Sequence, residues 1–478
     1  MTLAGALEAA EAAAPVESLD VVARMLKEHL QAASVSFLIT DFTGSSVVRL
    51  GTADSIDTDE PPQRILLRDT LYEDVIRTQQ PQVEHRDESQ HVRVIAPVTN
   101  RGDAIGLLEL FLPAVPDAEV IREIGETAHA LAYIVIANRS HTDVYQWGRR
   151  TKPLSLAAEI QHRLLPASLA CEAAQFAVAG ALEPAEHVGG DTFDYVIDRD
   201  TVQLSVTDAM GHDVDAALLA SLVVGALRRA RREGADLAEQ ARQADQAMRA
   251  HGRSGFVTGQ LLRISLLDGG TEFVNAGHPW PLRMRDGKVE EIVLKVDRAF
   301  GLNIHPSEAN TYRVQTLDLR PGDRLIMLTD GMLERHAESL DLADLIIRTR
   351  ELHPREAART LIKAIVDAGN GHLDDDATVM CLDWHGVHNS ERNAANGADL
   401  TDASPPATTG PRAPSSDTQP SRAGKAGPAA FPSTPGLPRR PGAVSSSTVP
   451  RAVQQQGGRG ARGVCAQPAP SSDPLSPW

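Results

Sequence analysis

Four segments rich in aspartate and glycine, each at the end of an apolar run, constrain this chain more than any other feature. They lie at 188–194, 206–212, 328–331 and 373–380. Glycine permits tight turns and close approach of the backbone, so strand ends beside glycine can project carboxylates into one cleft. A single Asp-Gly segment is more often an ordinary turn. Four such segments within one region favour a shared site instead.

Carboxylates that converge repel one another, and their pKa values rise unless a cation neutralises the charge. These segments offer aspartate and main-chain oxygens, and they contain neither cysteine nor clustered histidine. Oxygen ligands of this kind suit hard octahedral ions such as Mg2+ or Mn2+, and a zinc site is not expected. The residues therefore predict a magnesium or manganese centre.

Taken in order, the motifs resemble the SpoIIE/RsbU-like branch of the PPM (protein phosphatase 2C-like) family. They read Val188-Gly-Gly-Asp191, Asp208-Ala-Met-Gly-His212, Ala276-Gly-His-Pro279, Pro321-Gly-Asp323, Thr329-Asp-Gly331 and Asp375-Asp-Ala-Thr378. The match runs from about Gln161 to Asp383. It implies an α+β fold for this region, an α-β-β-α sandwich in which helices cover two antiparallel sheets. We place this phosphatase domain at residues 175–385.

The resemblance also implies a centre of two Mn2+ or Mg2+ ions held by aspartate side chains and one main-chain carbonyl. The implied ligands are Asp191 and Asp208, which bridge the ions, Asp330 and Asp375, which hold the second ion, and the carbonyl of Ala209. Water activated by two such ions can attack phosphorus without a protein nucleophile, so the four aspartates are also the expected catalytic residues. Asp374 and Asp376 stay open as stand-ins for Asp375.

Some residues beside these ligands have roles that the sequence leaves open. Asp194 resembles the second aspartate of its motif and serves either as outer support for a ligand or as part of a turn. His212 and His278 each follow a glycine in a turn, where a structural histidine competes with a general acid. At Asp213 this branch usually has glycine, and an aspartate there is expected to cap the following helix.

Residues 16–147 read as an α+β unit ahead of the phosphatase domain, behind an arm at 1–15. The pattern predicts a helix at 16–32, a strand at 35–41, a hairpin of strands 91–98 and 104–111, and an amphipathic helix at 116–147. The hairpin resembles that of GAF domains. The resemblance implies a sensory or dimerising module, with a small-molecule ligand and a homodimer as expected partners. A ligand-free dimerisation scaffold stays open as the alternative.

Residues 148–174 are expected to form a helical linker. An amphipathic helix at 154–165 places Ala157, Ile160 and Leu164 on one face and stops at a proline. Since it lies between the N-terminal domain and the first phosphatase strand, we expect it to carry control from one to the other. A rigid spacer is the alternative.

Amino-acid composition and net charge give expectations for the C-terminal segment, the partners and the location of the protein. Residues 386–478 are rich in Pro, Ser, Ala and Gly and poor in aromatic and branched apolar side chains, so a disordered tail is expected there. The formal net charge of -17 argues against a nucleic-acid partner. The sequence shows no signal-peptide pattern, no apolar run long enough to span a bilayer and no cysteine framework, so we expect a cytoplasmic protein without a membrane partner.

These features predict a metal-dependent protein serine/threonine phosphatase in bacterial-type signalling, controlled by its N-terminal domain. The resemblance suggests a phosphorylated regulator protein as the substrate, of the anti-sigma factor antagonist type. One alternative is a signalling adaptor whose phosphatase domain only binds, which predicts missing ligands, whereas all four aspartates are present. Another is a hydrolase of small phosphate esters, which would have a deep, closed pocket at the metals.

Overall fold

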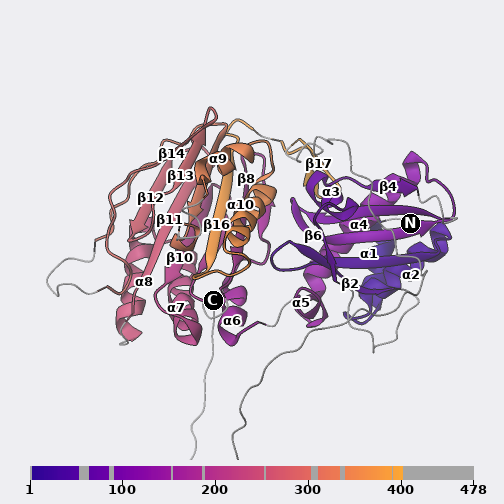
Figure 1. Cartoon of the computed structure of the whole chain (residues 1–478), viewed down its shortest axis with the longest axis horizontal. Helices are drawn as coiled ribbons and strands as arrows, with labels where there is room; N and C mark the ends of the chain where they lie inside the picture. The colour runs from indigo at the N-terminus through magenta and orange to yellow at the C-terminus, as the bar shows by residue number, and fades with distance from the viewer. Residues whose placement is uncertain are drawn as a thin grey trace, which may run out of the picture. The chain divides into compact units, whose positions relative to one another are not determined.

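The computed structural model of the protein describes residues 3–52, 64–85, 91–151, 154–185, 189–251, 255–302, 311–333, 340–389 and 391–401. Most of the segment expected to be disordered, from residue 402 onward, lies outside this part. Figure 1 shows one sheet with its helices in the N-terminal third of the chain, in indigo and purple, and a pair of sheets in the part that follows, in magenta to orange. No helix in the described ranges combines the length and apolar character needed to cross a bilayer.

The N-terminal domain is built on a six-stranded antiparallel sheet with the strand order β3-β2-β1-β6-β5-β4. The strands are β1 (Ser34–Thr40), β2 (Ser46–Thr52), β3 (Arg64–Leu66), β4 (Gln82–His85), β5 (Val92–Asn100) and β6 (Asp103–Leu112). One apolar core joins the sheet to α1 (Leu3–Ala12), α2 (Ser18–Leu30) and α4 (Ala118–Asn138), and a second core joins it to α3 (Leu71–Thr78). The expected α+β organisation is therefore present, while the GAF resemblance stays a prediction.

Alternation along β1 explains why this sheet carries helices on both faces. Phe37 and Ile39 belong to the core shared with α1, α2 and α4, whereas Leu38 between them belongs to the core beneath α3. Successive side chains of a strand point to opposite faces. An unbroken apolar run is therefore buried on both sides, and each large side chain so buried contributes roughly 1.5–3 kcal/mol.

Two helical details of this domain differ from the prediction. The single helix expected at 116–147 is divided into α4 and α5 (Val144–Gly148), because the polar run after Asn138 has no apolar stripe that could continue the helix. Asn138 instead donates a hydrogen bond to Ser18 Oγ at 2.8 Å, which joins the end of α4 to α2. The expected arm at 1–15 contains α1, whose inward alanines are buried in the core.

The middle part of the chain forms a sandwich of two antiparallel sheets. One has the order β12-β11-β10-β9 and the other the order β14-β13-β15-β16-β8-β7. Their strands are β7 (Ala170–Glu172), β8 (Phe176–Glu183), β9 (Thr192–Ile197), β10 (Thr201–Ala209), β11 (Val257–Ser265), β12 (Thr271–Ala276), β13 (Leu282–Arg285), β14 (Lys288–Glu291), β15 (Asp323–Leu328) and β16 (Ala377–Trp384). Buried side chains of both sheets, among them Phe176, Phe193, Phe273 and Trp384, form the core between them.

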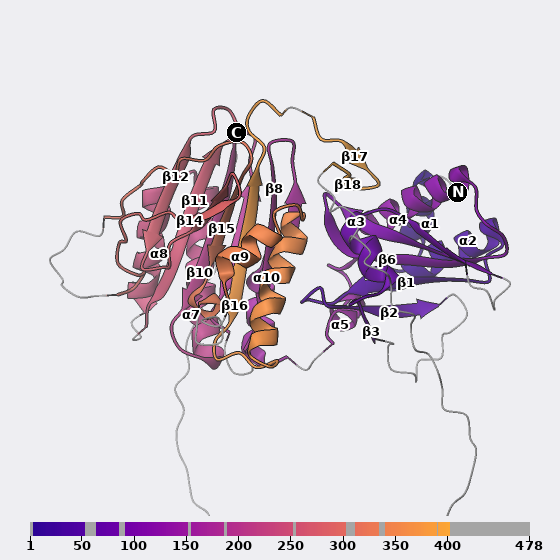
Figure 2. The ribbon, with the colours of Figure 1, turned by 45° about the horizontal axis from the view of Figure 1, so that its top comes forward.

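Helices cover the outer face of each sheet, which confirms the expected α-β-β-α sandwich. The helices α7 (Asp213–Arg232) and α8 (Leu237–His251) pack on the four-stranded sheet. The helices α9 (Leu342–Arg348) and α10 (Pro354–Ala368) pack on the six-stranded sheet, and Figure 2 shows them in front of its strands. The short helix α6 (Leu156–Leu164) packs against α7.

Ordered elements lie on both sides of residues 175–385. Strand β7 pairs with β8 at the edge of the larger sheet, so the domain begins by Ala170 and not at 175, and the linker is shorter. Beyond residue 385 the chain forms a hairpin of β17 (Ala394–Ala395) and β18 (Ala398–Asp399), inside the segment expected to be disordered. At this hairpin, specific contacts with the rest of the chain give an ordered structure, although the composition of the segment is typical of disorder.

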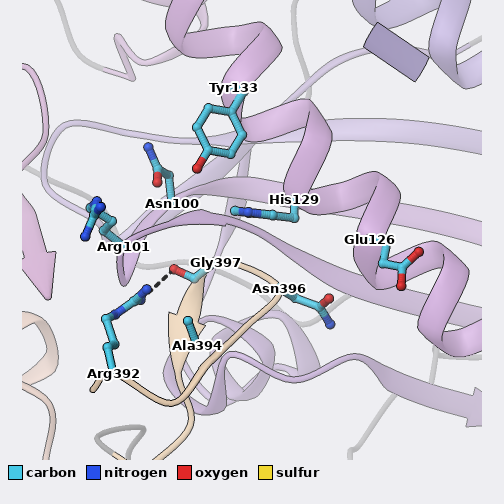
Figure 3. Close-up of a pocket in the computed structure, with 9 residues that line it drawn as sticks. All are labelled: Asn100, Arg101, Glu126, His129, Tyr133, Arg392, Ala394, Asn396 and Gly397. Atoms are coloured by element: carbon cyan, nitrogen blue, oxygen red, sulfur yellow. Dashed lines mark hydrogen bonds between the residues drawn. The ribbon is translucent and has the colours of Figure 1, made fainter. Parts of the chain in front are cut away.

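The hairpin turns at Asn396 and Gly397, both of which have positive φ angles. Arg392 donates to the carboxylate of Glu172 and, at 2.9 Å, to the carbonyl of Gly397, and Figure 3 draws the second bond. The backbone N–H of Asp399 donates to Glu172 at 2.7 Å. A Cβ on Gly397 would lie 2.1 Å from a carbonyl oxygen of β5, so only glycine fits this turn.

Candidate metal centre

The four predicted acidic ligands lie at strand ends of both sheets. Asp191 immediately precedes β9, and Asp208 lies near the end of β10, the strand paired with β9. Asp330 follows β15 in the short 3-10 helix η1 (Asp330–Met332), and Asp375 lies just before β16, the strand paired with β15. Each sheet therefore contributes two aspartates from neighbouring strands.

Two glycines allow these segments to approach closely. A Cβ on Gly190 would lie 2.4 Å from the carbonyl oxygen of Ala209, and a Cβ on Gly331 would lie 2.1 Å from the carbonyl oxygen of Asp376. Both positions therefore require glycine. The first contact sets the loop before β9 against the end of β10, and the second sets η1 against the start of β16.

A threonine hydroxyl links the two sheets at this point. Thr329 Oγ1 donates to Asp191 Oδ2 at 2.7 Å and accepts from the backbone N–H of Thr378 at 3.1 Å. Asp191 is 2% exposed, and both threonines are fully buried. In such a setting a satisfied hydrogen-bond network holds its members rigidly. Thr329 therefore fixes the Asp191 carboxylate next to Asp330, a role that the motif pattern did not reveal.

Asp376 is more buried than Asp375, the predicted ligand. Its carboxylate accepts hydrogen bonds from three backbone N–H groups, those of Ala185 at 2.9 Å, Gly190 at 3.2 Å and Asp191 at 3.4 Å. It also accepts one from Gln161 Nε2 on α6, at 2.5 Å. These bonds occupy the Asp376 oxygens, so Asp376 anchors the loop before β9 and Asp375 keeps the freer carboxylate.

Gln161 is a residue of this region that sequence reasoning missed. The predicted buried face of its helix was Ala157, Ile160 and Leu164, whereas the structure buries Ala157, Ala158 and Gln161. Ile160 and Leu164 are only partly buried. A polar side chain between small apolar ones at helical spacing was the available signal, since a buried amide needs a buried partner.

The acidic residues raise one another's pKa. Burial raises the pKa of Asp191 well above its usual range, and the charges of Asp208 and Asp376 raise it further. Burial also raises the pKa of Asp375 to about 6, with smaller contributions from Asp376 and Asp330 that are partly offset by a backbone hydrogen bond. A cation placed between such groups relieves the repulsion.

The donor set fits divalent cations of the magnesium type. Within the described ranges, no three His, Cys, Asp or Glu side chains stand together as a ready-made ion-binding group. The carboxylates act on one another electrostatically instead, Asp191 with Asp208 and Asp376, and Asp375 with Asp376 and Asp330. Octahedral coordination would then be completed by main-chain oxygens such as that of Ala209 and by water, which is the ligand set that Mg2+ prefers.

Asp194 belongs to the scaffold around these ligands. Its carboxylate pairs with Arg228 at 3.1 Å and with Arg231 at 3.2 Å, both on α7. Arg228 also donates to the main-chain oxygen of Leu164, at the end of α6. Asp194 therefore fastens β9 to α6 and α7, which favours the supporting role over that of a turn residue.

The two histidines differ in burial. His278 is buried, with Nδ1 at 2.8 Å from Thr258 Oγ1 and Nε2 at 3.0 Å from the main-chain oxygen of Leu328. Burial lowers the pKa of His278 to about 4, so its ring is neutral and structural near pH 7. His212 is exposed, and its Nδ1 lies 2.9 Å from Asp213 Oδ2.

The prediction that Asp213 caps α7 is wrong. The capping residue is His212, and Asp213 is the first residue of the helix, with a φ of 61°. That left-handed conformation suits glycine and costs other residues roughly 1–2 kcal/mol. The backbone conformation thus accounts for the glycine expected at this position.

Comparison with known proteins bears on the same part of the chain. Residues 198–385 match the family model described as "Stage II sporulation protein E (SpoIIE)". The "Phosphoserine phosphatase RsbU" of Bacillus subtilis (strain 168) is 23% identical over 238 residues, which make up 48% of this chain and 69% of that protein.

Two solved structures are similar to the same region. The RsbU and RsbW domains of a Mycobacterium tuberculosis protein are 22% identical, cover 46% of this chain and 62% of that one, and give a TM-score of 0.39. The PP2C phosphatase domain of SpoIIE from Bacillus subtilis, with a fragment of its regulatory domain, is 20% identical, covers 44% and 65%, and gives 0.38. This chain thus spans less than two thirds of either solved chain. Residues 198–385 therefore match the SpoIIE family model, and the predicted motif order and the two-sheet sandwich lie in the same part of the chain.

Proposed function

We propose that the protein removes phosphate from phosphoserine or phosphothreonine on a regulator protein. Two Mg2+ or Mn2+ ions would be held by the four aspartates and the Ala209 carbonyl. The observation that carries the proposal is geometric: paired strand ends of both sheets present the four aspartates, and Gly190 and Gly331 let these segments approach closely. The resemblance to the RsbU-like branch supports a substrate of the anti-sigma factor antagonist type.

The predicted ligands differ in burial, and we expect the buried and the exposed ones to have different roles. Bound divalent ions lower the pKa of water and neutralise charge on a phosphate ester. Asp191 is buried and oriented by Thr329, which keeps the inner side of the centre rigid. Asp330 is exposed and Asp375 is half-buried, so a phosphorylated side chain on the surface of another protein can approach from their side.

The cysteines do not provide a competing nucleophile in the described part of the chain. Cys171 and Cys381 are buried, and burial raises their pKa to about 11 and about 12. Because the thiolate is the reactive form, neither thiol is activated near pH 7. This supports hydrolysis by activated water over a covalent phosphocysteine route.

We also propose that α6 carries control from the N-terminal domain to the centre. On one side, its Gln161 donates to the main-chain oxygen of Asp191 at 2.9 Å. On the other side, the ring of His162 lies 4.3 Å from the ring of Phe42, in the turn after β1. A shift of this turn would therefore move the residue that holds the metal-binding loop.

The test compares Asp208→Asn with Asp286→Asn on a phosphopeptide. The parent should need Mn2+ or Mg2+ and lose activity with a chelator, and Asp208→Asn should lose several orders of magnitude in turnover because a bridging charge is gone. Asp286 lies in the exposed turn between β13 and β14, so its variant should keep the parent's rate. Equal rates for Asp208→Asn and the parent would refute the assignment.

A further inference from the structure

A hollow of about 310 Å³ lies where the end of α4, the residues after α5 and helix α6 meet. The lining residues that matter for its chemistry are Phe42, Arg139, Arg149, Glu159, His162 and Arg163. None of the predicted metal ligands lines it, so it is a separate site.

Three guanidinium groups and one carboxylate line this hollow. The carboxylate of Glu159 is already engaged, because it pairs with Arg150 and lies 3.7 Å from Arg163. Arg139 donates to the main-chain oxygen of Ala167 at 2.7 Å, an uncharged acceptor, and acts electrostatically on Asp103. The lining therefore carries an excess of positive charge.

Two buried nitrogen atoms of the lining, Arg149 Nε and His162 Nδ1, have no hydrogen-bond partner among the residues that the structure describes. Both side chains stack on Phe42, with Arg149 Cζ 4.4 Å from the centroid of its ring and the His162 ring 4.3 Å from it. Stacking uses the flat faces of these groups and leaves their nitrogen edges for oxygen acceptors. A buried polar atom without a partner is destabilising, so an acceptor from outside the chain would stabilise this arrangement.

Two nearby carboxylates offset only part of the positive charge of the lining. Asp103 and Asp41 both act on Arg149 electrostatically, but no hydrogen bond joins either of them to Arg149 in the described ranges. Asp103 accepts from Ser168 Oγ at 2.6 Å, and burial raises its pKa. Asp41 accepts from Ser46 Oγ at 2.6 Å. The hydrogen bonds that these two carboxylates accept thus come from uncharged hydroxyl groups.

A larger hollow, of about 490 Å³, lies beside the C-terminal hairpin and is drawn in Figure 3. Its Arg392 is bound to Glu172 and Gly397, and the carboxylate of Glu126 also lines it. The charge of Arg392 is therefore matched by Glu172 from within the chain. The hollow beside α6 is therefore the better anion site.

We propose that the hollow beside α6 binds a small organic anion that carries phosphate or carboxylate groups. Its oxygens would accept from Arg149, Arg163 and His162, and its charge would offset the excess of the lining. A volume near 300 Å³ is at the lower end for small-molecule pockets, which suits a metabolite-sized ligand. Since His162 follows Gln161, occupancy would hold α6 in one position; this consequence rests on the proposed function, whereas the binding itself does not.

The test is calorimetric titration of the full chain with citrate and with pyrophosphate, after removal of metal on a chelating resin. At least one of the two probes should bind at one site per chain. Arg149→Gln should weaken binding about tenfold or more, and Arg163→Gln, at a side chain 64% exposed and so safe for folding, about threefold or more. Arg348→Gln is the matched control, because this arginine is 71% exposed on α9 and pairs with Asp344.

Melting curves of the variants would establish that each is folded. The proposal is overturned if neither probe binds saturably, or if both lining variants bind as tightly as the parent and Arg348→Gln. Because the titration contains no metal, its outcome does not depend on phosphatase activity. A negative result would therefore leave the proposed function intact, and an inactive phosphatase would leave the anion site intact.

Discussion

At the scale of residues, the side-chain amide of Gln161 connects helix α6 to the acidic centre. Its Nε2 donates both to Asp376 Oδ2 and to the main-chain oxygen of Asp191, and all three groups are buried. Removing one partner of a buried hydrogen bond leaves the other unsatisfied, which costs more than the bond itself contributes. Gln161 is therefore expected to matter for stability and for the placement of Asp191.

Gln161→Ala should lower the free energy of unfolding by about 1–3 kcal/mol. It should also lower the metal-activated phosphatase rate about 10–100-fold, the usual range for groups that orient a ligand. Urea unfolding and initial rates over a Mn2+ series would measure the two effects. Gln243→Ala is the control, since that amide donates to the partly exposed Glu239 on its own helix. A parental rate for Gln161→Ala would mean that the loop before β9 is held without α6.

The left-handed backbone at Asp213 leads to a second prediction for one residue. Asp213→Val should lower the free energy of unfolding by about 1–2 kcal/mol, because a β-branched side chain is strained at a φ of 61°. Asp213→Gly should leave stability within about 1 kcal/mol of the parent. Thermal melts of the two variants would decide. Asp213→Val as stable as Asp213→Gly would contradict the left-handed conformation.

At the scale of elements, α6 is held both by apolar packing and by specific hydrogen bonds. Leu164 packs against the core that α7 and α8 share with the four-stranded sheet. Ser155 caps the start of the helix by accepting from the N–H of Ala158 at 3.1 Å, and a proline follows its end. The helix is thus short, bounded at both ends and fixed by side chains, which suits an element that transmits a shift as a unit.

Leu164→Asn should lower the phosphatase rate of the full chain by more than its effect on folding explains, because it loosens the packing that positions α6. The loss of stability is expected at about 1–2 kcal/mol for a partly buried leucine. Leu218→Asn, at a leucine 40% exposed on α7, is the control. Rates that stay equal in both variants, with folding preserved, would leave α6 as a rigid spacer.

At the scale of the whole molecule, the buried Glu172 joins β7, the start of α10 and the C-terminal hairpin. Burial alone would raise its pKa, but hydrogen bonds from His353 and Arg392, together with the charge of Arg392, outweigh burial and hold the pKa of Glu172 at about 2. Burial and the charge of Arg355 lower the pKa of His353, so its ring is neutral near pH 7 and Arg392 supplies the positive charge. The carboxylate is therefore stabilised in its ionised form.

Glu172 should make the fold sensitive to acid. Its folded pKa of about 2 lies below the usual 4.5, so its contribution is present above about pH 4.5 and is lost as the pH falls towards 2. The contribution amounts to at most about 3 kcal/mol. Urea unfolding of the parent and of Glu172→Gln at pH 7 and pH 3.5 would measure it. The gap in stability between the two proteins should narrow at the lower pH, and a constant gap would contradict the depressed pKa.

Two truncations should separate the ordered hairpin from the rest of the C-terminal segment. Ending the chain after residue 401 should leave the melting temperature and the phosphatase rate unchanged, because the composition beyond it offers no core. Ending it after residue 390 removes Arg392 and the N–H of Asp399 from the buried Glu172 and should lower the melting temperature by several degrees. Equal melting temperatures for the two truncations would show that the hairpin contributes no stability.

The elements that the sequence predicted well are those whose signal is local. The strand expected at 35–41 and the hairpin expected at 91–98 and 104–111 match β1, β5 and β6, because an apolar run between turn residues reports directly on a buried strand. The helix α8 was not predicted, since alanine, glutamine and arginine dominate it and its buried face includes Gln240 and Asp245. Polar residues on a buried face weaken the periodic signal.

By itself, the sequence determined where the acidic chemistry lies and which aspartates are candidates, because carboxylates beside glycine at strand ends form a pattern that is visible within a few residues. Only the tertiary structure decided that Asp376 is an anchor, that Gln161 is its partner and that a hairpin is ordered inside a Pro- and Ala-rich segment. Gln161 and Asp376 are 215 residues apart in the chain, and Glu172 and Arg392 are 220 apart. A buried polar group is stable only when the fold supplies it with a hydrogen-bond partner. No local sequence pattern indicates which distant residue that partner will be.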